Sequence, residues 1–141
     1  MRNVYIPAVP VPQGSMSVFN GRIVHKKSKR LMDYRNLIAN VASQHYSEPI
    51  EGAVRVDLRF IIPRPKTVMR SRPSVPPDLD KLIRAVLDAL TGVAYKDDAQ
   101  VTAVSAFKRY GDGWLTSGVW ITVEYDDWII NEVPGLPIRE R

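Results

Sequence analysis

One amphipathic helix near the middle of the chain constrains the fold more than any other feature. Its aliphatic residues recur at spacings of three and four, which places them on one helical face: Leu79, Leu82, Ile83, Val86, Leu87 and Leu90. Such a face must pack on a core. Pro76 and Pro77 favour extended geometry before the helix, and Gly92 suits the left-handed residue that commonly follows one. The pattern predicts a helix that begins between Asp78 and Asp80 and ends before Gly92.

Carboxylates flank this helix at both ends. Asp78 and Asp80 precede or open it, and Asp97 and Asp98 follow it after a short connection. Residues two apart share a side only in extended geometry, so Asp78 and Asp80 converge if the helix starts at or near Asp80. The helix dipole then favours their ionised form, which suits a hard cation. A simpler interpretation also fits, because an Asp at a helix start is commonly an N-cap and consecutive Asp residues commonly form a solvated turn.

The composition indicates one soluble globular domain over residues 1–141. The chain has 141 residues, of which 45% are hydrophobic, and it contains no cysteine. A disulfide framework and a thiolate metal site are therefore excluded. We find no apolar run long enough for a membrane span or a signal peptide. These features predict a cytoplasmic protein that does not associate with membranes.

Basic residues are unevenly distributed along the chain. The formal net charge is +5, and twelve of the 20 Lys and Arg residues fall between positions 22 and 72. Two clusters are candidates for DNA binding: Lys26, Lys27, Lys29 and Arg30 in the first, and Arg64, Lys66, Arg70 and Arg72 in the second. If the clusters meet in space, they form a phosphate-binding surface beside the carboxylates. If they lie on separate faces, they are ordinary solubilising charge.

The first half of the chain predicts two strands and a helix. Residues 4–11 are apolar but contain three prolines, which limits them to an edge strand. A loop is expected over 13–20, and residues 21–25 form a short extended piece. Residues 31–45 have helical periodicity, with Leu31, Tyr34, Ile38, Val41 and His45 on one face. Residues 54–62 alternate as a strand with one buried face.

The second half predicts a basic loop and two further strands. A loop over 63–75 precedes the Asp pair, and residues 101–110 and 119–125 read as strands joined in a hairpin by Gly111, Asp112 and Gly113. Val119, Ile121, Val123 and Tyr125 should face the core, with Trp120 outward. The element order β-α-β-α-β-β predicts an α/β (α+β) domain with a mixed sheet and helices packed on it. We expect the apolar tail, residues 126–141, to dock on a partner subunit.

The acidic motifs and their spacing resemble those of the RusA family of Holliday-junction resolvases. The resemblance rests on the Asp78-Leu79-Asp80 run, a basic residue four positions on, the Asp88-Ala89-Leu90 run, and Asp97-Asp98-Ala99-Gln100-Val101. It implies a homodimeric, bacterial or phage-encoded endonuclease that resolves four-way DNA junctions by paired symmetric nicks in recombination and repair. The alternative is a basic junction- or DNA-binding protein without catalytic activity.

The resemblance also implies roles for individual residues. Asp78, Asp80 and Asp98 match the catalytic aspartates, which would ligate Mg²⁺ or, as a substitute, Mn²⁺, with Asp97 as an auxiliary ligand. The family commonly has Asn after its Asp-x-Asp run and an important Lys four residues beyond it, where this chain has Lys81 and Arg84. Lys81 and Arg84 are therefore both candidates for the catalytic cation. The two are not interchangeable, because an ammonium and a guanidinium group differ in shape and in hydrogen bonding. Other nuclease classes fit less well, because the chain has two histidines and neither Glu-x-Lys nor Asp-x-Lys.

Overall fold

The computed structural model describes residues 3–14, 16–19, 22–25, 28–112, 115–128 and 135–137, and only the backbone of 16–19 and 22–25. Lys26, Lys27 and most of the tail therefore lie outside the described residues, and the prediction that the tail docks on a partner stays untested. Among the described helices, none is both long and apolar enough to cross a membrane.

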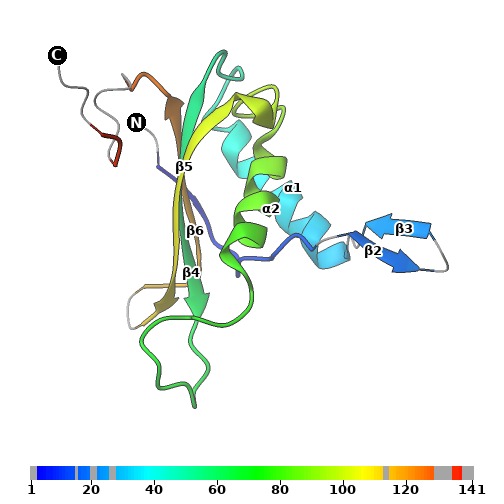
Figure 1. The fold of residues 1–141 in the computed structure, drawn as a ribbon, viewed down its shortest axis with the longest axis vertical. Helices are drawn as coiled ribbons and strands as arrows, with labels where there is room; N and C mark the ends of the chain where they lie inside the picture. Colours follow the sequence, from blue (N-terminus) through cyan, green and yellow to red (C-terminus); the bar gives the residue numbers. More distant parts are fainter. Residues whose placement is uncertain are drawn as a thin grey trace.

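A four-stranded mixed sheet carries both helices on one side (Figure 1). The helices are α1 (Lys29–Ser43) and α2 (Leu79–Leu90). The sheet has the order β1-β6-β4-β5, with the bounds β1 (Asn3–Ile6), β4 (Val54–Pro63), β5 (Val101–Gly111) and β6 (Gly118–Tyr125). A separate ribbon of β2 (Met16–Phe19) and β3 (Arg22–His25) projects beyond α1. The predicted α+β class with a mixed sheet and packed helices is confirmed.

The core lies between the sheet and the two helices, as the apolar periodicities require. On β4, Val54, Val56, Leu58 and Phe60 are at most 1% exposed, as expected for a strand with one buried face. The helices contribute the residues predicted from their 3.6-residue period, namely Leu31, Tyr34, Ile38, Leu82, Val86 and Leu90, all of which are buried. Burial on this scale holds α2 firmly against the sheet.

The predicted hairpin between the last two strands is wrong. β4 lies between them, pairing in parallel with β5 and antiparallel with β6. The chain reverses direction between β5 and β6, but the connection crosses over one strand instead of joining neighbours. Gly113 of the predicted turn lies outside the described residues. Strand β4 is apolar enough to be buried between two partners, and this burial takes precedence over the local turn preference.

Smaller corrections concern the ends of elements. Part of the expected loop over 13–20 is strand β2, which pairs with β3. Tyr125 is 61% exposed instead of facing the core, and His45 lies beyond the end of α1. Trp120 points outward as predicted and packs on Tyr5, with ring centroids 4.7 Å apart.

Both ends of α2 are fixed by hydrogen bonds. Gln13 donates through its backbone N–H to the Lys81 carbonyl (3.0 Å) and through its side chain to Asp88 (2.5 Å). At the other end Gly92 has φ +87°, the left-handed conformation predicted after the helix, and the buried Tyr95 hydroxyl donates to the Leu87 carbonyl (2.7 Å). The helix is a rigid support for any group at its ends.

Candidate functional site

Asp78 and Asp80 lie at the beginning of α2, exposed to solvent. Asp78 occupies the N-cap position in extended geometry (φ −68°, ψ 139°), and its side chain makes no capping hydrogen bond. Asp78 is therefore the N-cap residue by position, as the simpler interpretation expects, but its carboxylate is not used for capping. Asp80 lies in the first helical turn, where the helix dipole stabilises negative charge. Two ionised carboxylates at this position can act as ligands for a divalent cation.

Two cations accompany these carboxylates. The Lys81 ammonium lies 3.5 Å from Asp78 Oδ2, and about two fifths of its side chain remains exposed (39%). Arg84 is exposed one turn further along α2 and has no hydrogen-bond or ion-pair partner among the described residues. Lys81 is thus engaged with a carboxylate, while Arg84 remains available to an external anion.

Lys108 fixes the approach to this end of α2, and the sequence reasoning missed it. Its ammonium donates to the backbone carbonyls of Val75 and Pro77, each at 2.8 Å. Pro77 directly precedes Asp78, so the two bonds tie the acidic segment to β5. One feature of the sequence could have indicated this role. Lys108 is two residues from the buried Tyr110 and so shares its side of β5, where an unpaired ammonium is unfavourable.

Asp97 and Gln100 have structural roles. The Asp97 carboxylate accepts from the Ala99 backbone N–H (2.8 Å) as the cap of a short 3₁₀ helix, Asp98–Gln100. The Gln100 side chain donates to the Ile50 and Gly52 carbonyls and accepts from the N–H groups of Lys96 and Asp97. In the second acidic motif, Asp97 therefore caps the 3₁₀ helix, and Gln100 connects the segment before that helix to the loop before β4. The Asp98 side chain is exposed and has no hydrogen-bond partner among the described residues.

Asp98 lies at the opposite end of the molecule from Asp78 and Asp80. Asp98 lies just before β5 begins, close to Gln100, which binds the loop before β4. Asp78 directly follows Pro77, whose carbonyl is bound by Lys108 near the other end of β5. The seven residue-to-residue steps from Val101 to Lys108 correspond to about 23 Å of extended strand. Within the described part of the chain, no group of three His, Cys, Asp or Glu residues is placed to hold a metal ion. One chain alone does not bring the predicted ligands together.

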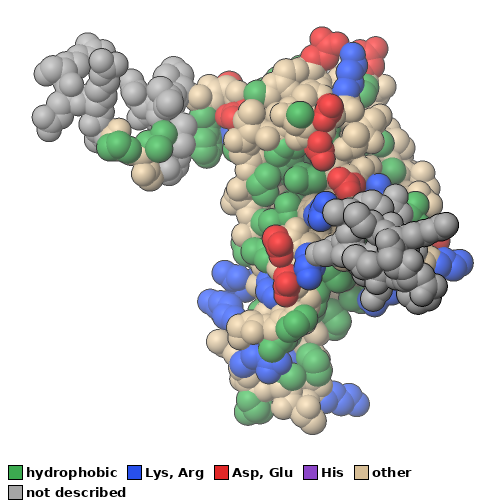
Figure 2. Space-filling model, turned by 45° about the vertical axis from the view of Figure 1, so that its right-hand side comes forward, with side chains coloured by type: hydrophobic (Ala, Val, Ile, Leu, Met, Phe, Trp, Pro, Cys, Tyr) green, Lys and Arg blue, Asp and Glu red, His purple; other side chains and the backbone are tan. Residues whose placement is uncertain are grey.

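Arg30 of the first basic cluster lies beside both ends of the loop that carries the second cluster. Arg30 on α1 lines a pocket together with Ile62, Pro63, Pro76 and Pro77, which joins the first cluster to the loop that precedes α2. In Figure 2 most Lys and Arg side chains on the visible face lie in its lower half, while acidic side chains extend up to the upper end. Whether the two clusters form one phosphate-binding surface stays a prediction, because Lys26 and Lys27 lie outside the described residues.

Arg64 and Lys29 are engaged within the chain. The Arg64 guanidinium pairs with Asp112 (2.9 Å), donates to the Arg70 carbonyl (2.6 Å), and lies over the ring of Tyr110. This pairing holds the pKa of the exposed Asp112 carboxyl below its usual range. Lys29 pairs with Asp33 (2.7 Å). Four other members of the clusters are exposed and have no such partner among the described residues: Arg30, Lys66, Arg70 and Arg72.

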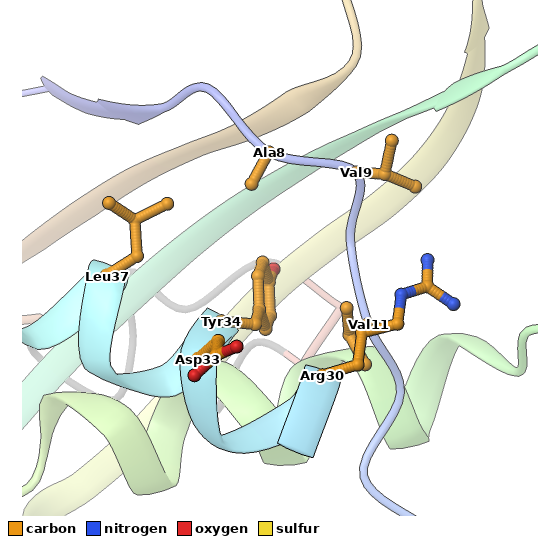
Figure 3. Close-up of a pocket in the computed structure, with 7 residues that line it drawn as sticks. All are labelled: Ala8, Val9, Val11, Arg30, Asp33, Tyr34 and Leu37. Carbon is orange, nitrogen blue, oxygen red and sulfur yellow. The ribbon is translucent and has the colours of Figure 1, made fainter. Parts of the chain in front are cut away.

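A mostly apolar pocket on the α1 side does not fit a cation. Figure 3 shows it between the segment 8–11 and α1, with the Tyr34 ring directed toward Ala8. Its only acid, Asp33, is already paired with Lys29. Burial raises the pKa of the Tyr34 phenol well above its usual range, so that hydroxyl stays neutral.

Comparison with known proteins agrees with these motifs. Residues 7–124 match the family described as Endodeoxyribonuclease RusA, a range that contains every candidate aspartate. A relative from Bacillus subtilis (strain 168), "Uncharacterized protein YqaN", is 34% identical over 118 residues. That alignment covers 73% of this chain and 83% of the relative.

Proposed function

The chain belongs to the RusA family of endodeoxyribonucleases, and from this premise we propose that it is a magnesium-dependent homodimer that resolves four-way DNA junctions by paired nicks. The observation that carries the proposal is the exposed, uncapped pair Asp78 and Asp80 at the rigid start of α2, beside a basic surface. A phosphodiester resists hydrolysis because its oxygens are anionic, so a nuclease must bring positive charge to them. The basic surface binds the junction backbone, and the acidic pair positions the cation.

The metal site fits the chain only if a second subunit contributes to it. Asp78 and Asp80 supply two carboxylates, but Asp98 is too remote within the same chain to be the third. In a two-fold dimer, the remote end of one subunit can lie at the acidic pair of the other. We therefore place Asp98 of the partner subunit at the site of Asp78 and Asp80. When bound, Mg²⁺ or Mn²⁺ would neutralise phosphate charge and lower the pKa of water.

A dimer also fits the symmetry of the substrate. A four-way junction has approximate two-fold symmetry, and two equivalent sites would cut two strands at symmetric positions. Lys66, Arg70 and Arg72 lie on the loop directly before Asp78, where they can contact phosphates on either side of the cut.

Arg84→Ala is expected to slow junction cutting on the order of 100-fold without weakening the fold. Arg84 has no partner among the described residues, so its removal leaves no buried group unpaired, whereas Lys81 already balances Asp78. Lys81→Ala is the matched comparison and should cut within about threefold of the parent, because exposed ion pairs contribute little. Single-turnover cutting rates decide between them. An unchanged rate for Arg84→Ala with a large loss for Lys81→Ala would move the catalytic role to Lys81.

The function itself is tested by cutting of a synthetic four-way junction. With Mg²⁺ the protein should introduce symmetric paired nicks, and EDTA should abolish cutting while leaving junction binding in place. A linear duplex of the same sequence is the matched control and should remain intact. Tight binding without cutting under Mg²⁺ or Mn²⁺ would favour the alternative function, a non-catalytic junction-binding protein.

A further inference from the structure

The sheet face opposite the helices carries a continuous row of large side chains. Helices α1 and α2 cover one face, and no helix of the described residues lies on the other (Figure 1). On this open face, the strand register places Tyr5 of β1 beside Trp120 of β6. Arg59 of β4 lies beside Trp120 on one side and beside Phe107 of β5 on the other. Because neighbouring strands are about 4.8 Å apart, three rings and one guanidinium form a band across all four strands.

The aromatic part of this row is fixed in place within the chain. The ring centroids of Tyr5 and Trp120 are 4.7 Å apart, and the Tyr5 hydroxyl donates to the Ser117 carbonyl (3.0 Å). A Cβ at Gly118 would lie 2.6 Å from the Tyr5 ring, so the glycine lets that ring lie close against the sheet. Trp120 remains 36% exposed. A ring that is already held before binding loses little conformational entropy when a flat ligand stacks on it.

A hollow of about 350 Å³ opens beside the row. Its lining residues are Arg59, Ile61, Phe107, Arg109, Leu115 and Trp120, with no acid among them. Arg109 lies over the Phe107 ring, 4.9 Å from its centroid, whereas Arg59 is exposed and has no hydrogen-bond, ion-pair or ring partner among the described residues. Asp57, two residues before Arg59 on the same face, lines a second hollow on the other side of the row. The larger hollow therefore combines an aromatic wall with a free cation.

We propose that the row of Tyr5, Trp120, Arg59 and Phe107 binds unpaired nucleotides of single-stranded DNA. Unpaired bases expose flat faces that stack on aromatic rings, and a cation beside the rings binds the phosphates. Open four-stranded sheets with aromatic side chains hold roughly two or three bases of a single strand in this way. One base stacks on Trp120, and a neighbouring phosphate pairs with Arg59 on the side of the row away from Asp57.

This site is separate from the acidic pair and goes beyond the proposed function. Helix α2, which begins directly after Asp78, lies on the opposite side of the sheet (Figure 1). Intact duplex DNA does not fit the row, because its bases are stacked on one another and offer no free face. The ligand is therefore a single strand, and its binding requires neither metal nor cutting.

Binding of a short fluorescein-labelled oligothymidylate in EDTA, followed by fluorescence anisotropy, tests the site. A strand of the same length built from abasic nucleotides keeps every phosphate but has no base to stack. The parent should bind the oligothymidylate on the order of tenfold more tightly than the abasic strand. Trp120→Ala should remove this difference by weakening oligothymidylate binding alone. Trp120→Phe keeps an aromatic ring and should recover most of the loss, which distinguishes stacking from damage to the fold.

The salt dependence of binding tests Arg59 separately. Each phosphate contact with a single strand contributes about 0.7 to the steepness with which log affinity falls against log salt concentration. Arg59→Met keeps most of the apolar stem and should make this slope shallower by about 0.7, whereas Trp120→Ala should leave the slope unchanged. Asp57→Asn is the matched control on the same face and should not weaken binding, because it removes only a negative charge.

Several outcomes would overturn the site. Equal affinity of the parent for the oligothymidylate and the abasic strand would show that charge alone binds them. Unchanged oligothymidylate affinity in Trp120→Ala would exclude stacking on this row. Failure of the parent to bind either strand would also overturn the proposal. If Trp120→Ala then converts a dimer into a monomer in analytical ultracentrifugation, the open face is an interface between copies of this chain instead.

Discussion

A heterodimer that carries Asp80→Asn in one subunit and Asp98→Asn in the other is expected to nick four-way junctions, although each variant alone is inactive. Each homodimer should cut on the order of 1000-fold more slowly than the parent, because both of its sites lack one carboxylate. In the heterodimer, one site combines the two substitutions. The other combines intact Asp78 and Asp80 with intact Asp98 of the partner subunit. One working site of two predicts about half of the parent's nicking rate.

The product distinguishes one working site from two. On a supercoiled plasmid that extrudes a cruciform, paired cuts give linear DNA, whereas a single nick gives an open circle. Heterodimers purified through two different tags should give open circles almost exclusively. The matched control is Asp78→Asn paired with Asp80→Asn, which leaves neither site intact and should be inactive. If the Asp80→Asn and Asp98→Asn heterodimer is equally inactive while junction binding is retained, the shared site is wrong.

The elements of this fold could be predicted from sequence where the signal was local. The apolar spacing from Leu79 to Leu90 identified α2, and alternation from Val54 identified β4, because burial of one face sets both periods. The sheet order could not be read in the same way. Gly111 and Asp112 have the chemistry of a tight turn, but that chemistry does not determine whether a third strand inserts between the two that it connects.

The candidate site was predicted in its parts but not in its arrangement. The family resemblance selected Asp78, Asp80 and Asp98, and all three carboxylates are exposed and free of hydrogen bonds to described residues, apart from the Lys81 contact with Asp78. The twelve-residue helix between them spans about 18 Å, so motifs adjacent in sequence lie at opposite ends of the molecule. Residue spacing alone cannot show that such motifs meet only across two subunits. Lys108 escaped notice because its partners are backbone carbonyls, which no side-chain motif reveals.

Lys108→Met is expected to slow cutting on the order of 100-fold while leaving junction affinity within about threefold of the parent. Methionine keeps most of the apolar stem but removes both hydrogen bonds to the Val75 and Pro77 carbonyls. The segment before Asp78 then loses its attachment to β5, and displacement of a catalytic group by about 1 Å can cost about 100-fold in rate. The same loss should raise the Mg²⁺ concentration needed for half-maximal rate, because the two carboxylates are no longer held together in advance.

That shift in Mg²⁺ dependence distinguishes a positioning role from a purely structural one. A general loss of stability would lower the melting temperature and the active fraction, but it would not change the half-saturating Mg²⁺ concentration of the folded molecules. Lys108→Arg keeps donors at this place and should recover part of the rate. Arg109→Met is the matched control, since Arg109 stacks on Phe107 and, among the described residues, donates only to the carbonyl of its neighbour Lys108. An unchanged Mg²⁺ dependence in Lys108→Met, with the rate loss matched by Arg109→Met, would remove Lys108 from the site.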